Sequence, residues 1–305
     1  MTIKVFGPTI RRPANNKFYI FDLDGTLTIS KRGKLFSTTV EDTLILPPVE
    51  AKVAELKAEG YNILIVTNQS YFSVDTVAKL NMVADVLDVP ILCAAGDKSP
   101  ARKPAPAMWY HYCLAAGIDP LTVDELHMTG DAAGPESSYP PYRWAATDRL
   151  FAQAIGATFH EPLDVFPAYR LPKIPDFLTV TVMVGNQGSG KTNFARQLAD
   201  LSAHQHIEGD KFKTRAKTLK AAKEALAVGR SVIIDATNSS LDRRQECYAL
   251  ADAVGAVKRV FWIPRDGRPF NDLRTEGKVP PVAHAVYSKH FEDPRGDGVP
   301  VEIVY

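Results

Sequence analysis

The sequence predicts an α/β protein of two domains, each a mainly parallel sheet with helices on both faces. Short apolar runs alternate with helical patterns along both halves of the chain, as expected for strands joined by crossover helices. The chain has 305 residues, which is enough for two domains of ordinary size. A segment with four prolines and no periodicity, EPLDVFPAYRLPKIPD (161–176), separates the two patterns. We therefore expect domains over 1–165 and 177–305, joined by a linker over 166–176.

The individual elements follow from the length and spacing of the apolar runs. In the first half the expected strands are FYIF (18–21), NILIV (62–66), ILCAA (91–95) and ELHMT (125–129). Two helices are expected over 49–60 and 107–117, and each ends at a glycine, which favours termination. In the second half we expect a helix over 191–203 and the strands LTVTVMVG (178–185), SVIIDAT (231–237) and VKRVFWI (257–263).

Charge and cysteine usage restrict the class of protein further. The formal net charge is +1, so a polyanionic partner would have to be held by local basic patches. The three cysteines are scattered without metal-ligand spacing, which suits a reducing compartment. The N-terminus lacks a signal-peptide core, and no apolar run is long enough for a membrane span. These features predict a soluble intracellular protein without a membrane partner, nuclear in a eukaryote and cytoplasmic otherwise.

Acidic, hydroxyl and basic residues follow successive strands of the first half. Asp22 and Asp24 come directly after a strand, Thr67 ends the next one, Lys103 lies in RKP, and Asp131 lies in TGDAAG. Ligands of open α/β sheets bind beyond the carboxyl ends of the strands, so we expect these side chains to meet there. Phosphoryl transfer needs such a set: an anionic nucleophile, a hydroxyl and a lysine for phosphate oxygens, and carboxylates for Mg²⁺. Taken alone, FDLDGT is also compatible with a solvated Asp-rich turn.

The order DxDGT, Thr, Lys, GD resembles the haloacid dehalogenase superfamily of phosphatases. The resemblance implies that Asp22 is the nucleophile, forming an aspartyl-phosphate, and that Asp24 is the general acid and later the base. It further implies that phosphate is bound by Thr67, Asn68 and Lys103, and Mg²⁺ by Asp22, Asp131 and the backbone carbonyl of Asp24. Asp148 has two readings, a residue of this site or a helix cap.

The spacing of the motifs predicts an open first site. The stretches between Asp24 and Thr67 and between Gln69 and Lys103 leave no room for a large cap domain, which suits a bulky substrate. The loop GPESSYPPYRW (134–144) is the best candidate for a wall that selects the substrate. Its aromatic residues either stack on a terminal base or pack onto the domain; they are Tyr139, Tyr142 and Trp144.

The second half opens with a phosphate-binding loop. GNQGSGKT (185–192) fits GxxxxGKT and lies between a strand and a helix, which is the context that supports the motif. We expect backbone N–H groups of the loop to cradle the phosphates of ATP, Lys191 to reach the β/γ oxygens, and Thr192 to bind Mg²⁺. The glycines that allow this are Gly185, Gly188 and Gly190.

Later features of the second half suggest a kinase. Asp210 is placed to accept a proton from an acceptor hydroxyl. Arg274 lies in NDLRTEGKVP, a segment expected to fold over ATP as a lid, and Asp235 ends a strand. The stretch 211–230 carries seven Lys/Arg and one Glu, and it is either a solvated helical face or a contact surface for a phosphate backbone.

Over nearly its whole length the chain resembles the polynucleotide kinase 3′-phosphatase family, on GDAAG, DRLFA, DATNSSLDRR, NDLRTEGKVPP and YSKHFEDP. The resemblance implies removal of 3′-phosphates and ATP-dependent phosphorylation of 5′-hydroxyls at DNA or RNA strand ends. By it, Asp210 is the general base, Lys191 and Arg274 stabilise the transferring phosphoryl group, and Asp235 and Lys213 orient the substrate.

One residue departs from the family pattern: Gly209 stands where many relatives have Arg. One phosphate contact is therefore either lost or supplied by Lys211 or Lys213. A paired metabolic phosphatase and small-molecule kinase, acting on a sugar or nucleotide, is the alternative function. A binding module with one dead site is disfavoured, because both catalytic sets are intact.

Overall fold

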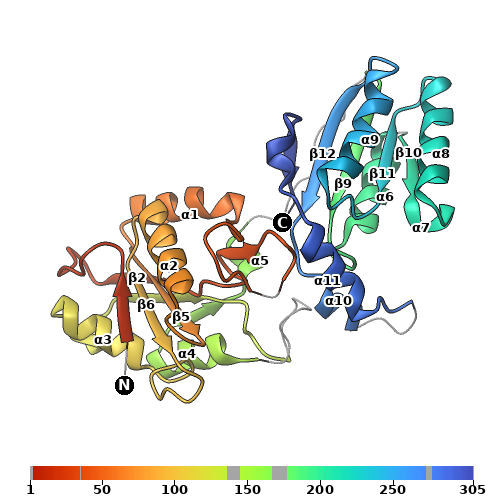
Figure 1. Ribbon diagram of the computed structural model, residues 1–305. Coiled ribbons are helices and arrows are strands. Elements are labelled where there is room, and N and C mark those ends of the chain that lie inside the picture. The colour runs from red at the N-terminus through yellow and green to blue at the C-terminus, as the bar shows by residue number, and fades with distance from the viewer. Residues whose placement is uncertain are drawn as a thin grey trace. The chain divides into compact units, whose positions relative to one another are not determined.

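The computed structural model describes residues 3–34, 36–135, 145–166, 177–202, 204–272 and 277–304. The chain divides into two compact units, Met1–Ser30 with Leu35–Ala168 and Lys31–Lys34 with Tyr169–Tyr305. Of the expected linker, 167–176 lies outside the described residues, and Phe166 packs in the core of the first unit. The predicted α/β class with mainly parallel sheets is confirmed in each unit (Figure 1).

A six-stranded sheet of order β1-β6-β5-β2-β7-β8 forms the centre of the first unit. Its pairs are parallel except for β1, which runs antiparallel to β6. The four expected strands are confirmed, whereas the edge strands β1 and β8 were not expected. The bounds are β1 Ile3–Phe6, β2 Lys17–Phe21, β5 Asn62–Gln69, β6 Ile91–Ala95, β7 Glu125–Thr129 and β8 Thr158–His160.

Helices cover both faces of this sheet because successive strand residues point to opposite sides. Phe21 and Ile65 face a core shared with α1 and α2, whereas Ile20 and Leu64 face a core shared with α3 and α4. The helix bounds are α1 Pro47–Ala58, α2 Val74–Leu87, α3 Ala107–Ala116, α4 Thr147–Ile155 and α5 Pro162–Val165, with a 3₁₀ turn at Pro120–Thr122. A small antiparallel pair, β3 Thr28–Ser30 and β4 Thr43–Ile45, follows the DxDGT turn.

The second unit has a five-stranded, wholly parallel sheet of order β10-β11-β9-β12-β13. Its strands are β9 Thr179–Gly185, β10 Gln205–Glu208, β11 Val232–Asp235, β12 Val257–Ile263 and β13 Val301–Ile303. Phe194 and Leu198 of α6 pack on Met183, Ile233 and Phe261 of the sheet. The helices are α6 Lys191–Ser202, α7 Gly209–Phe212, α8 Arg215–Ala227, α9 Leu241–Asp252, α10 Arg268–Asp272 and α11 Pro281–His290, followed by a 3₁₀ turn at Pro294–Asp297.

In both sheets the strand that carries the main motif is central. β2 lies between β5 and β7, and β9 lies between β11 and β12. Because these neighbours run parallel, their carboxyl ends meet at one edge and the loops that follow them share a site. Within the described ranges, none of the helices combines the length and apolar character that a membrane crossing requires.

Candidate active sites

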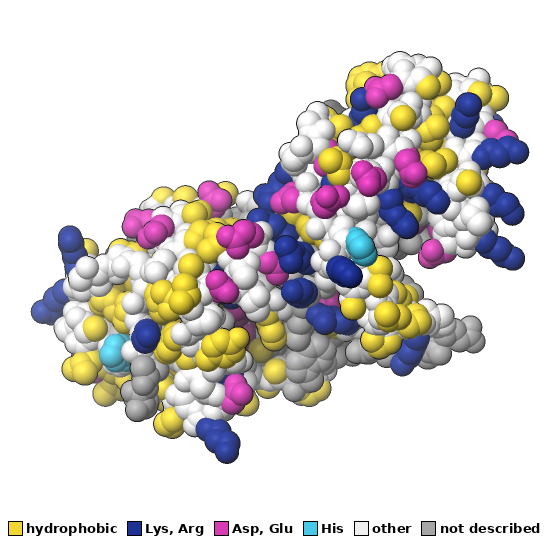
Figure 2. All heavy atoms as spheres, in the orientation of Figure 1, with side chains coloured by type: hydrophobic (Ala, Val, Ile, Leu, Met, Phe, Trp, Pro, Cys, Tyr) yellow, Lys and Arg dark blue, Asp and Glu magenta, His cyan; other side chains and the backbone are white. Residues whose placement is uncertain are grey.

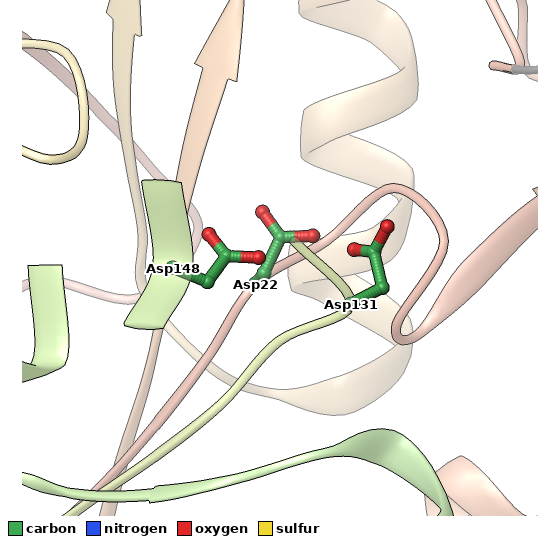
Figure 3. A group of neighbouring side chains, drawn as sticks. All are labelled: Asp22, Asp131 and Asp148. Atoms are coloured by element: carbon green, nitrogen blue, oxygen red, sulfur yellow. The ribbon is translucent and has the colours of Figure 1, made fainter. Parts of the chain in front are cut away.

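Three buried aspartates converge at the carboxyl edge of the first sheet (Figure 3). Asp22 follows β2, Asp131 follows β7, and Asp148 lies in the first turn of α4. One carboxylate oxygen from each lies within 4.8 Å of the others, and each residue is at most 7% exposed. The sheet order accounts for Asp22 and Asp131 meeting, because β2 and β7 are parallel neighbours.

Lys103 holds the positive charge at the centre of this cluster. Its ammonium forms an ion pair with Asp22, lies 2.7 Å from Asp148 Oδ1, and donates to the Val66 carbonyl at 3.0 Å. Burial alone would lower the pKa of Lys103, but Asp148 and Asp22 raise it above its usual value. Lys103 is therefore a fixed cation at neutral pH.

The DxDGT turn fits closely around Asp131. Gly25 has φ +95°, and a Cβ at this position would lie 2.7 Å from Asp131 Oδ2, so both the conformation and the contact require glycine. The Thr26 hydroxyl lies 3.0 Å from Asp131 Oδ1 and also accepts the Asp131 backbone N–H at 3.0 Å. This contact ties the turn after β2 to the turn after β7.

Burial raises the pKa of two of these aspartates. It raises the pKa of Asp22 to about 6, with Asp148 adding to the shift and Lys103 opposing it. Burial, together with Asp22 and Asp148, raises the pKa of Asp131 well above its usual value. Three carboxylates beside one lysine leave excess negative charge, which a divalent cation would neutralise. The hard oxygen donors fit Mg²⁺, so these residues suit the expected metal.

Asp24 lies beside the cluster, and its carboxylate makes different contacts. Both oxygens accept from Lys79, at 2.9 and 3.0 Å, and Oδ2 also accepts from Gln69 Nε2 at 2.7 Å. The expected metal role of Asp24 concerned its backbone carbonyl, and its side chain is separate from the group formed by Asp22, Asp131 and Asp148. Asp24 remains at the site, because it lines the same cavity as Asp22.

Thr67 and Asn68 line this cavity of about 560 Å³ together with Lys103. The Thr67 hydroxyl accepts from Gln69 Nε2 at 3.0 Å. The side-chain amide of Asn68 forms two hydrogen bonds with the backbone of Lys103: it accepts from the Lys103 N–H at 2.9 Å and donates to the Lys103 carbonyl at 3.1 Å. Asn68 thereby fixes the loop that presents the lysine, in addition to its expected place near phosphate.

Two residues of the first site differ from what the sequence suggested. The helix-cap reading of Asp148 is wrong: Ala146 is the N-cap of α4, and Asp148 pairs with Lys103 and accepts the Ala132 N–H at 3.0 Å. Lys79 was not singled out, because a lysine in an amphipathic helix usually faces solvent. The three aromatic residues proposed for the loop 134–144 lie outside the described residues.

The second site is a cavity of about 400 Å³ over the phosphate-binding loop. Gly188 has φ +76° and a Cβ there would meet the Gly267 carbonyl at 2.5 Å, so this turn requires glycine. Lys191 is buried at the start of α6 and donates to the Asn186 carbonyl at 2.5 Å. Lys191 and Thr192 line the cavity, and Gly185 and Gly190 also have positive φ. Arg274 lies outside the described residues.

The same cavity is also lined by the residues expected to act on the acceptor hydroxyl. Asp210 in α7 is exposed, and it has no hydrogen-bond or ionic partner within the part of the chain that the structure describes. Asp235 is buried at the end of β11, with Oδ2 3.0 Å from His206 Nε2. Lys213 lines the cavity at φ +61°, an uncommon conformation for a residue with a side chain.

The position of Gly209 is crowded. A Cβ there would lie 3.2 Å from the Asp235 carbonyl and 3.3 Å from Ala236 Cβ. Of the two lysines considered as substitutes for an arginine, Lys211 pairs with Glu208 at 2.7 Å, whereas Lys213 faces the cavity. Lys213 is therefore better placed to contact a substrate phosphate.

The basic stretch 211–230 is mostly the helix α8. Figure 2 shows Lys and Arg side chains along the edge of the second unit where α8 lies in Figure 1. Arg215 differs from the others because it is bound within the protein, with Nε 2.8 Å from Glu246 and Nη1 2.9 Å from Asn238 Oδ1. Lys220 is largely exposed and lies 3.8 Å from Glu224. The seven basic residues are thus not equivalent.

Comparisons with known proteins find a match for each half of the chain. Residues 17–166 match the family model for polynucleotide kinase 3 phosphatase, and residues 180–267 match an AAA domain model. The chain is 30% identical over 261 residues to the bifunctional polynucleotide phosphatase/kinase of Schizosaccharomyces pombe, covering 75% of this chain and 62% of that protein. It is 26% identical, over an alignment of 348 residues, to the putative bifunctional polynucleotide phosphatase/kinase of Acanthamoeba polyphaga mimivirus. This alignment covers 90% of this chain and 80% of that protein.

A third relative matches mainly one half of the chain. The polynucleotide 3′-phosphatase ZDP of Arabidopsis thaliana is 28% identical over 177 residues, covering 50% of this chain and 24% of that protein. Each half of the chain therefore has its own family match, in the order expected from the motifs. With a 3-phosphatase domain followed by a P-loop kinase domain, the chain belongs to the polynucleotide kinase 3′-phosphatase family.

Proposed function

We propose that the protein is a bifunctional enzyme of nucleic acid strand ends, which removes 3′-phosphates and phosphorylates 5′-hydroxyls with ATP. The observation that carries the proposal is the presence of two chemically different candidate phosphate sites in one chain. The first combines a buried aspartate cluster with Lys103, and the second combines a phosphate-binding loop with an exposed carboxylate, Asp210. The relatives named as polynucleotide phosphatase/kinases supply the substrate class.

In the first site, Asp22 attacks phosphorus while the bond to the 3′-oxygen of the strand breaks. Asp24 gives its proton to that oxygen, and Lys103 and Thr67 hold the phosphate oxygens. Water then attacks the aspartyl-phosphate, Asp24 takes its proton, and inorganic phosphate leaves. A pKa of about 6 leaves the Asp22 carboxylate largely ionised at neutral pH, as a nucleophile requires. Mg²⁺ held by the aspartates would supply charge neutralisation.

In the second site, Asp210 takes the proton of the 5′-hydroxyl as its oxygen attacks the γ-phosphoryl group of ATP. Lys191 stabilises the charge on the transferring group, and Thr192 is the residue of the loop that would hold Mg²⁺. Asp235, in contact with His206, lines the same cavity, where Lys213 would contact the strand. The lid role of Arg274 stays a prediction.

A strand that carries both a 3′-phosphate and a 5′-hydroxyl tests the two activities together. We expect the protein to remove the first group and, with labelled ATP, to phosphorylate the second. Asp22→Asn should lose only dephosphorylation, and Lys191→Ala should lose only phosphorylation. Matched DNA and RNA strands and a panel of sugar phosphates complete the assay. Turnover of a sugar phosphate without turnover of either strand would contradict the proposed substrate.

A further inference from the structure

The carboxylate of Asp24 is surrounded by hydrogen-bond donors. Oδ1 accepts from Lys79 at 2.9 Å and from the Thr28 hydroxyl at 3.3 Å. Oδ2 accepts from Gln69 at 2.7 Å and from Lys79 at 3.0 Å. A carboxylate that is held at both oxygens has one orientation, because χ2 rotation would break several contacts together.

Lys79 is the charged member of this set, and it comes from a different element than the catalytic motifs. It lies in the middle of α2, is 1% exposed, and its remaining contact is the Ser37 carbonyl at 3.0 Å. The three acceptors use the three N–H bonds of its ammonium group. Its neighbours Leu80 and Val83 are part of the apolar core, so α2 is fixed in place by packing.

A buried ion pair of this kind rarely increases stability compared with apolar residues, because both charges lose their hydration. The Lys79–Asp24 pair therefore suggests a functional reason for a lysine on the buried side of α2. Asp24 lines the cavity, but the cluster of Asp22, Asp131 and Asp148 does not include it. Without Lys79, the contacts of Asp24 would be those from neutral groups only.

We propose that Lys79 is a positioning residue for the phosphatase reaction: it fixes the Asp24 carboxyl group in the orientation from which Asp24 exchanges a proton with the leaving oxygen. This inference rests on the proposed function of the first site. Lys79 acts through Asp24 and takes no part in bond formation. Its removal should therefore impair only those steps that need a proton from Asp24.

The leaving group distinguishes such a role from a structural one. p-Nitrophenolate departs without a proton, whereas the alkoxides of glycerol 2-phosphate and of a 3′-phosphorylated strand require one. In Lys79→Met we expect the single-turnover rate of the first step to fall roughly 100-fold for both alkyl esters, with KM nearly unchanged. The initial burst of p-nitrophenolate should keep its wild-type rate. Lys79→Arg, which retains the charge and the donors, should recover part of the lost rate.

Lys57→Met is a control in the same unit, because Lys57, like Lys79, contacts both backbone and a carboxylate, but away from the site. It donates to two backbone carbonyls and lies 3.4 Å from the Asp88 carboxylate. This variant should leave all three substrates unaffected. A burst rate of p-nitrophenolate that falls as much as the first-step rate on the alkyl esters, or no loss on any of the substrates, would overturn the proposal. If the wild-type protein hydrolyses glycerol 2-phosphate but not the strand, the proposed function is contradicted, while the comparison between Lys79→Met and the wild type remains valid.

A double-mutant cycle keeps the proposal testable if Lys79→Met alone does not fold. Asp24→Asn combined with Lys79→Met removes both buried charges, so neither is left without its partner. If Lys79 acts through Asp24, this double variant should hydrolyse glycerol 2-phosphate no more slowly than Asp24→Asn alone. A further loss of rate in the double variant would show that Lys79 acts on its own and would refute the positioning role.

Discussion

Replacing Asp22 with asparagine should stabilise the first unit in the absence of metal while it abolishes dephosphorylation. The reason is that burial disfavours ionisation of the Asp22 carboxylate; Asp148 and Asp24 add to this effect, and Lys103 offsets only part of it. Burial raises the pKa of Asp22 from 3.8 to about 6. One pKa unit corresponds to ~1.4 kcal/mol, so the ionised form destabilises the folded state by about 3 kcal/mol.

The direction of the pH dependence follows from this shift. The folded state binds the proton of Asp22 more tightly than the unfolded state, so stability is greatest below pH ~4 and falls as the pH rises toward ~6. Above that pH the deficit is constant. The stabilisation by Asp22→Asn should therefore be absent near pH 4 and complete at pH 8. For a unit of this size, 1 kcal/mol shifts Tm by roughly 2–4 °C, which predicts a shift of several degrees.

Thermal unfolding in EDTA at several pH values measures the effect, with the transition of the second unit as an internal reference. Adding Mg²⁺ at 1,000 times its Kd should reverse the order, because the wild-type site then gains about 4.1 kcal/mol, which exceeds the deficit, and the variant has lost a ligand. An Asp22→Asn protein that is less stable than wild type at pH 8 in EDTA would refute the reasoning. So would a stabilisation that is the same at pH 4 and pH 8.

Three further predictions concern the kinase site and the choice of strand end. Asp210→Asn should lower the turnover of the kinase by ~10²–10⁴ and leave ATP binding nearly unchanged, as measured by calorimetry; unchanged turnover would exclude a general base at this position. Lys213→Ala should reduce the steepness with which the logarithm of the binding constant for a strand falls against the logarithm of the salt concentration, by ~0.7–0.9, whereas Lys220→Ala should leave this slope unchanged. Equal slopes for the two variants would exclude a phosphate contact at Lys213. A strand phosphorylated at both ends should lose only its 3′-phosphate, and release of the 5′-phosphate at a comparable rate in end-group analysis would contradict this selectivity.

The strands that carry the catalytic motifs could be predicted largely because a buried apolar run ends in polar residues. β2 and β5 follow this rule, whereas in β7 only Met128 and Thr129 are buried, and the polar turn after them was the signal. The order of these strands in a parallel sheet explains why Asp22, Thr67 and Asp131 share one edge. The short strands β1, β3, β4 and β8 lack such a pattern, since three or four residues show no clear alternation. They form because an existing sheet edge or hairpin offers partners.

Buried charges were harder to predict than the motifs, because burial depends on partners far away in the sequence. The other buried residues of α2 are apolar and recur at helical spacing, and only the pairing of Lys79 with Asp24 explains why this lysine faces inward. Asp148, near the start of a helix, has the sequence position of a cap, and its contact with Lys103 shows another role. Each is one half of an ion pair whose other half belongs to a recognised motif.

The basic stretch 211–230 shows why sequence alone could not identify its phosphate contacts. Its lysines and arginines look alike in the sequence, yet Arg215 is held by Glu246 and Asn238, whereas Lys213 faces the cavity that Asp210 also lines. Neutralising Arg215 would therefore mix the loss of an internal contact with any loss of strand binding. A single change at Lys213, compared with Lys220 on the exposed face of α8, separates substrate recognition from the charge of the helix as a whole.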